Sequence, residues 1–124
     1  MLEDKEPIAT VATRDLAVAK KFYQETLGLT LADENPEVLT FGKGQFKLFV
    51  YRSQYAGTNE ATAVTWSVGA EAEAIVGDLK RRGVVFEHYD MPGITREGDL
   101  HVGEGGKVAW FKDPDGNILS VNGM

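Results

Sequence analysis

The chain carries one sequence pattern twice, and this repeat constrains the fold more than any other feature. In each copy a short β-rich run precedes a stripe of apolar residues at helical spacing, and the stripe ends at a glycine. The two glycines, Gly28 and Gly83, lie 55 positions apart (83 − 28), and the same offset maps Ile8 onto Ala63. Three further β-rich runs follow each stripe. The sequence therefore predicts two tandem copies of one βαβββ unit.

We expect an α+β fold with mixed sheets in a single domain spanning residues 1–124. Unit one is expected at about 7–57 and unit two at about 61–124, with helices near 15–27 and 71–82 and eight strands. Asp15 is suited to cap the first helix. The last two strands flank Asp113-Pro114-Asp115-Gly116, a sequence typical of a tight turn.

Composition and charge exclude several classes of function. The chain has no cysteine, so thiolate nucleophiles and Cys-ligated metal centres are excluded. Its net charge is −6, and its basic residues gather only at Lys80-Arg81-Arg82, where they stabilise the end of a helix. We therefore expect no nucleic-acid partner. No apolar run has the length of a membrane span, so we expect no membrane partner and a cytoplasmic location.

Two motifs inside the repeat point to a known family. The helix that contains Phe22-Tyr23-Gln24-Glu25-Thr26-Leu27-Gly28-Leu29 and the hairpin at Asp113-Pro114-Asp115-Gly116-Asn117 occur in the expected units. Together with the repeat, they resemble the vicinal oxygen chelate superfamily, which includes glyoxalase I, fosfomycin resistance enzymes, extradiol dioxygenases and bleomycin resistance proteins. The resemblance implies that each sheet curls around a cup with its helix outside, and that two chains pair as a homodimer.

The resemblance also implies metal positions, and this sequence departs from them. Enzymes of the family hold a divalent metal with His, Gln or Glu on the first and fourth strands of both units. The matching residues here are Ile8, Leu48 (Phe49 if the register moves by one), Ala63 and Ser120. Apolar side chains cannot bind a hard or borderline cation. We therefore expect no metal and no other cofactor, with a relocated site as the open alternative, built from Glu87, His88, Asp90 or His101.

The alternation of strands suggests which side chains face the cup. On Phe46 to Tyr51 the pattern leaves two faces open, Phe46/Leu48/Val50 or Lys47/Phe49/Tyr51. The resemblance places Trp110 on the cavity side, whereas alternation favours the core for Trp66 unless the register shifts. No catalytic residue is expected. The candidate ligand-binding residues are Thr10, Phe49, Tyr51, Tyr55, Thr65, Trp66, Arg96, His101, Trp110, Ser120 and Asn122.

The two units differ by an insertion at 88–106, of which five residues are glycine. We expect this segment to act as a lid, with Met91, Ile94 and Leu100 closing over an apolar ligand and Arg96 bonding a carbonyl or acid on it. The alternative is a mobile connector.

The resulting hypothesis is a metal-free protein that sequesters an apolar or aromatic ligand, drug-like or a secondary metabolite, as in the antibiotic-resistance branch of the family. The enzyme alternative is a glyoxalase-like lyase, an isomerase or a dioxygenase with relocated metal ligands. A third possibility is an interaction module whose cup is filled by its own side chains.

Overall fold

The first half of the chain forms a four-stranded sheet with one helix packed on its outer face. In the computed structural model, which describes residues 1–123, β1 (Ala9–Thr13) leads into α1 (Leu16–Lys21) and a continuing π-helical turn, η1 (Phe22–Thr26). The strands β2 (Leu31–Glu34), β3 (Val38–Lys43) and β4 (Phe46–Arg52) complete the sheet in the order β1-β4-β3-β2. Strands β1 and β4 are parallel, and the other pairs are antiparallel.

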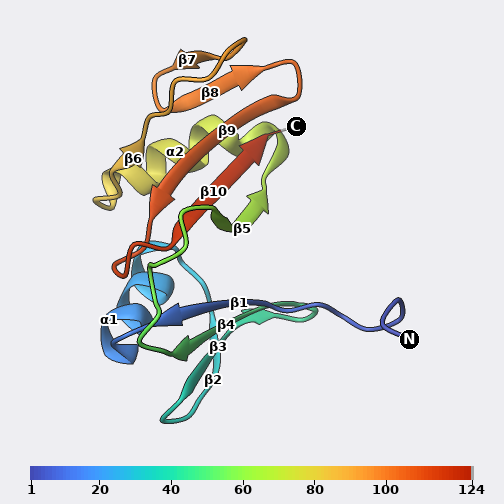
Figure 1. Cartoon of the computed structure of the whole chain (residues 1–124), viewed down its shortest axis with the longest axis vertical. Coiled ribbons are helices and arrows are strands. Elements are labelled where there is room, and N and C mark those ends of the chain that lie inside the picture. Colours follow the sequence, from blue (N-terminus) through green and yellow to red (C-terminus); the bar gives the residue numbers. More distant parts are fainter. Residues whose placement is uncertain (124) are drawn as a thin grey trace.

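The second half repeats this plan and extends it. After β5 (Thr62–Ser67), a 3₁₀ turn, η2 (Gly69–Glu71), leads into α2 (Ala72–Arg81) and β6 (Phe86–Glu87). Strands β7 (Thr95–Glu97), β8 (Leu100–Gly103), β9 (Gly106–Lys112) and β10 (Ile118–Gly123) follow. The sheet has the order β5-β10-β9-β8-β7, and β6 pairs with β9 beside β8 (Figure 1). The predicted α+β fold of two mixed sheets with helices outside is confirmed.

Local sequence explains where the helices begin and end. The Asp15 carboxylate accepts hydrogen bonds from the N–H groups of Ala17 and Val18, which caps the start of α1. Gly28 and Gly83 have φ of +73° and +94°, the left-handed conformation that ends a helix at low steric cost. Both predicted helices are confirmed, the first over residues 16–26 (α1 with η1) and the second over residues 72–81 (α2). No helix within residues 1–123 is long and apolar enough to cross a membrane.

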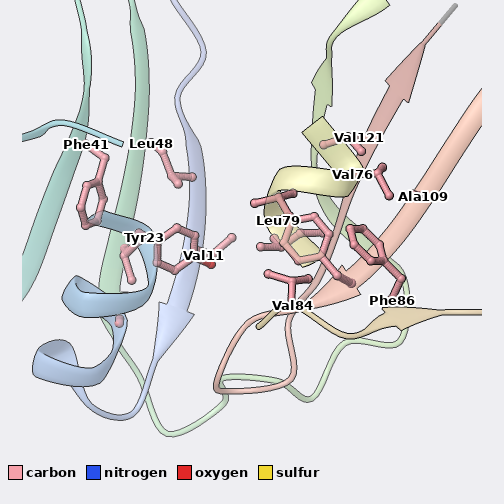
Figure 2. Close-up of a cluster of buried hydrophobic side chains, with 14 of the residues drawn as sticks. Val11, Tyr23, Phe41, Leu48, Val76, Leu79, Val84, Phe86, Ala109 and Val121 are labelled. Atoms are coloured by element: carbon pink, nitrogen blue, oxygen red, sulfur yellow. The ribbon is translucent and has the colours of Figure 1, made fainter. Parts of the chain in front are cut away.

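The core lies between each helix and its sheet. Figure 2 shows Phe41, Leu48 and Tyr23 grouped around α1 and η1, and Val76 and Leu79 of α2 directed toward the strands of the second sheet. In both sheets buried residues alternate with more exposed ones along the central strands. Each sheet therefore has one face covered by its helix. The opposite face is called the open face below.

The insertion does not have the loop structure that its glycines suggested. Residues 95–103 form the β7–β8 hairpin and extend the second sheet, so the described chain has ten strands where eight were expected. The hairpin turns at Gly98, whose φ is +64°. Leu100 is only 4% exposed and belongs to the core, so it cannot close over a ligand as proposed for a lid.

The Asp113–Asn117 turn joins the two halves of the molecule. Asp113 Oδ2 accepts a hydrogen bond of 2.6 Å from the buried Tyr23 hydroxyl of η1. Asn117 Nδ2 donates to the Ala12 carbonyl at 2.7 Å, and Asn117 Oδ1 accepts from Gly57 N–H. These bonds fix the orientation of the second sheet relative to the first. The turn thus has a tertiary role beyond reversing the chain.

Candidate functional site

The open face of the second sheet has two rows of side chains that run across the strands. The register pairs Trp110 with Ser120 and Ser120 with Thr65, which forms the first row. The second row lies two residues further along each strand and crosses from β7 to β5. Its members are Arg96, His101, Val108, Asn122 and Ser67. The tertiary fold therefore brings five of the sequence-predicted candidates together beside Thr65.

Three aromatic rings form a cluster on this face, defined here as Tyr89, His101 and Trp110. The ring centroids of His101 and Trp110 lie 4.8 Å apart and those of Tyr89 and Trp110 lie 5.3 Å apart, both in edge-to-face arrangements. Trp110 is held further by a 3.1 Å hydrogen bond from Nε1 to Thr62 Oγ1. A fixed indole ring of this kind offers a flat apolar surface to a ligand at little cost in side-chain entropy.

His101 is buried within the sheet, with 2% of its surface exposed. Its Nε2 accepts a 2.9 Å hydrogen bond from Tyr89 N–H, so the ring proton lies on Nδ1, which faces the Val108 carbonyl at 3.2 Å. Both ring nitrogens are therefore occupied by the protein's own backbone. This histidine supports the aromatic cluster and has no free nitrogen with which to bind a metal or transfer a proton.

A second polar chain borders the cluster. His88 Nε2 donates to Asp99 Oδ1 at 2.7 Å, and Arg96 Nη1 donates to His88 Nδ1 at 3.0 Å. Lys80 of α2 forms an ion pair of 2.9 Å with the other Asp99 oxygen. The hydrogen bond from His88, with that from Lys80 second, lowers the pKa of Asp99 below its ordinary value. This network fixes the Arg96 guanidinium beside the aromatic cluster.

Strand register decides which face each candidate of unit one occupies. Thr10 pairs with Phe49, and Ala12 pairs with Tyr51, on the open face of the first sheet. Leu48 is buried on the opposite face, so Phe49 is the residue at the fourth-strand position. Of the two alternatives for this strand, Lys47/Phe49/Tyr51 is therefore the set on the open face. Tyr55 is an exposed residue of the segment after β4. None of these residues belongs to the Tyr89–His101–Trp110 cluster.

The remaining tryptophan, Trp66, packs on the helix side of the second sheet against the core, as alternation predicted. It also borders a cleft of about 1080 Å³ between β1 and β5, the facing edge strands of the two sheets. Leu48 and Val64 line this cleft together with the N-terminal segment 3–7. Thr65 and Ser67, at the β5 edge of the open face, also line the cleft, whereas Trp110 does not.

Ser120 and Asn122 differ in how their polar groups are satisfied. Ser120 is buried, and its Oγ shares a hydrogen bond of 2.8 Å with Thr65 Oγ1. The Asn122 Oδ1 atom is buried and has no hydrogen-bond partner within residues 1–123. A buried acceptor without a partner is costly and rare.

The donor set does not fit a metal ion of the kind held by enzymes with this fold. The four positions carry Ile8, Phe49, Ala63 and Ser120, and only the last has a polar side-chain atom. In the part of the chain from 1 to 123, no group of three His, Asp or Glu side chains is arranged to bind a metal. His88 and His101, considered for a relocated site, are engaged by Arg96 and Asp99 and by backbone groups, respectively.

Sequence reasoning missed two residues of this face, Tyr89 and Asp99. Tyr89 lies two residues after Glu87, which pairs with Trp110. If the predicted strand had been extended to Glu87, the register would have indicated that Tyr89 lies near Trp110. Asp99 follows Gly98, and Gly-Asp between β-forming residues is a signal for a two-residue hairpin turn. That signal would also have identified β7 and β8.

Several solved structures share this architecture. A glyoxalase family protein from Enterococcus faecalis superposes with a TM-score of 0.73 at 20% identity, covering 98% of this chain and 99% of the other. A bleomycin-binding protein complexed with bleomycin gives a TM-score of 0.73 at 17% identity, covering 97% and 98%. A genomically encoded fosfomycin resistance protein from Listeria monocytogenes gives 0.71 at 12% identity, covering 95% and 91%.

A search of curated protein sequences finds no significant match. At these identities the structural likenesses establish the fold alone. The family assignment comes from the sequence itself, because the model of one family matches residues 7–121, nearly the whole chain. The chain therefore belongs to the glyoxalase/bleomycin resistance protein/dioxygenase superfamily.

Proposed function

We propose that this protein binds a small aromatic or largely apolar molecule on the open face of its second sheet and sequesters it without a metal, as in the bleomycin-resistance branch. The observation that carries the proposal is the Tyr89–His101–Trp110 cluster on a face whose metal-equivalent positions lack ligand donors. A stacked ligand would bury its ring against Trp110 and reach the hydroxyl group of the exposed Thr65.

The absence of an activated nucleophile on this face favours binding over catalysis. The hydroxyls of Thr65 and Ser120 bond each other, and no histidine contacts either of them. A hydroxyl without a neighbouring base is a weak nucleophile. The residues of the face are therefore suited to hydrogen bonding and stacking. The structural likeness to a protein complexed with bleomycin is consistent with this function, at the level of fold.

We also propose that the two units act as a single domain and that the active species is a homodimer. Apolar side chains exposed in the single chain include Tyr51 on the open face of the first sheet, and Tyr55 and Met91 in connecting segments. A second copy that covers these faces would close the cup around the ligand. Light scattering at micromolar concentration should therefore give a dimer mass, and a monomer mass would contradict this part of the proposal.

Native mass spectrometry with elemental analysis tests binding and metal content together. We expect gently purified protein to carry no stoichiometric metal and to gain the mass of bleomycin or of another flat aromatic probe from a panel. Stoichiometric zinc, nickel, manganese or iron, with stability lost in EDTA, would instead support the lyase, isomerase or dioxygenase alternative.

A pair of tryptophan variants locates the bound probe. Trp110→Ala should weaken binding of a probe found in that panel by about 1–3 kcal/mol, because aromatic burial is lost. Trp66→Phe, which retains a ring in the core, should leave the affinity unchanged. Equal losses in both variants would show that the ligand does not use the Trp110 face.

A further inference from the structure

Arg96 differs from the other lysines and arginines of the second unit in having no carboxylate partner in the described part of the chain. Within residues 61–123, five lysine and arginine side chains form ion pairs with carboxylates: Lys80, Arg81, Arg82, Lys107 and Lys112. Arg96 forms no ion pair with a carboxylate in the described chain. Its Nη1 bonds two neutral acceptors, His88 Nδ1 and the Gly98 carbonyl. The guanidinium is thus held in place while its charge is left uncompensated.

The orientation of Arg96 is built up through three further residues. Its acceptor on His88 is unprotonated because the ring proton of His88 is on Nε2, which donates to Asp99. Asp99 is fixed in turn by Lys80 of α2. An arginine has five N–H donors in a planar fork, and within residues 1–123 the hydrogen bonds of Arg96 all come from Nη1. The remaining donors can bind both oxygens of a planar oxyanion.

The position of Arg96 links this charge to the aromatic cluster. Arg96 pairs across the sheet with His101. The centroid of the His101 ring lies 4.8 Å from that of Trp110. The same row continues to Asn122, whose buried Oδ1 has no partner in residues 1–123. The row therefore begins with a fixed cation, and a flat apolar surface lies beside it.

We infer that the ligand of this face is an aromatic oxyanion, with its carboxylate or equivalent group held by Arg96 and its ring on the Trp110 cluster. This inference rests on the binding function proposed above and specifies its ligand class. In a protein of net charge −6 the overall field disfavours an anion, so its recognition must come from this local cation.

A matched pair of probes tests the inference: 2-naphthoate and its neutral isostere 2-naphthamide, titrated by calorimetry into the whole protein. Wild-type protein should bind the carboxylate about 10- to 100-fold more tightly than the amide, because charge-assisted hydrogen bonds to arginine are strong. Arg96→Gln should reduce this ratio to about one, chiefly by weakening binding of the carboxylate, and Arg96→Lys should restore part of the preference. Arg81→Gln, which removes an exposed arginine of α2, is the matched control and should retain the full ratio.

The outcomes separate this inference from the function on which it rests. If both probes bind wild-type protein equally, or if the preference survives Arg96→Gln in a variant with unchanged circular dichroism, the oxyanion assignment is wrong and aromatic binding stands. If neither probe binds at millimolar concentration, both the oxyanion assignment and the proposed aromatic-binding face are overturned.

Discussion

The two units share one plan and differ at the connection between their second and third strands. In unit one, residues 35–37 join β2 directly to β3. In unit two, residues 88–105 lie between β6 and β9 and contribute the β7–β8 hairpin. This hairpin widens the sheet and brings Arg96 and His101 onto the open face. The polar and aromatic groups of the candidate site are therefore concentrated in one of two otherwise equivalent units.

This comparison indicates that the repeat forms the scaffold of both units, whereas the insertion adds functional groups that only unit two has. The open face of unit one presents Thr10, Phe49 and Tyr51 without a fixed cation or an aromatic cluster. Figure 1 shows the insertion strands β7 and β8 at the far end of the molecule from unit one. A small number of inserted residues has thus given unit two a surface that its counterpart lacks.

The largest expected effect comes from separating the units. Asp113 accepts four hydrogen bonds, from Tyr23, from the backbone of Asp115, and from the backbone and side chain of Asn117. Asp113→Ala should lower the free energy of unfolding by about 3–5 kcal/mol, because several buried donors lose their acceptor. Urea unfolding measures this change. Asp115→Ala, which loses a single bond between the units, from Arg14 N–H, should cost less, and an equal loss would contradict the larger role given to Asp113.

A backbone contact between the units should give the next largest effect. A Cβ on Gly57 would lie 1.8 Å from the Asp115 carbonyl oxygen, and the φ of Gly57 is +72°. Gly57→Ala should therefore cost about 2–4 kcal/mol of unfolding free energy by displacing the turn of unit two from unit one. Thermal melts of both variants measure this change. Gly105→Ala, where an added Cβ meets nothing within 4 Å, should be nearly neutral.

Tyr23→Phe tests the same junction through its pH dependence and should cost about 1–2 kcal/mol at neutral pH. Burial, with the Asp113 charge second, raises the pKa of Tyr23 far above its ordinary value near 10. Because the pKa of Tyr23 is higher in the folded than in the unfolded protein, its contribution to stability is fully present below the unfolded pKa. This contribution falls as the pH rises above about 10. Wild-type stability should thus decline in alkali more steeply than that of Tyr23→Phe. Parallel pH profiles for the two proteins would contradict this role of Tyr23.

The smallest effect should be confined to the insertion of unit two. The Asp99 side chain is 11% exposed and accepts from both His88 and Lys80. Asp99→Asn should cost about 1 kcal/mol and raise hydrogen exchange within 95–103 more than within β3 and β4. Because the folded pKa of Asp99 is lowered, this contribution is present above about pH 4 and is lost as the pH falls further. Glu97→Gln, in the same hairpin without a described ion pair, should leave the exchange unchanged.

The sequence predicted the repeating parts of the fold because their signals are local. The cap at Asp15, the helix-ending glycines Gly28 and Gly83, and the turn at 113–116 depend on a few neighbouring residues. For the insertion the sequence predicts a loop, because glycines are more frequent there than the short β-forming runs around Gly98. Those runs become strands only when β9 is present to pair with them.

The sequence by itself determined the family, the two-unit plan and the loss of donors at the metal-equivalent positions, because each depends on residue identity at a fixed spacing. Only the tertiary structure decided that Phe49 faces outward while Leu48 is buried, since a one-residue change of register exchanges the two faces of a strand. It also decided that Arg96, His101 and Asn122 occupy one row, because their proximity arises from pairing between strands that are distant in sequence.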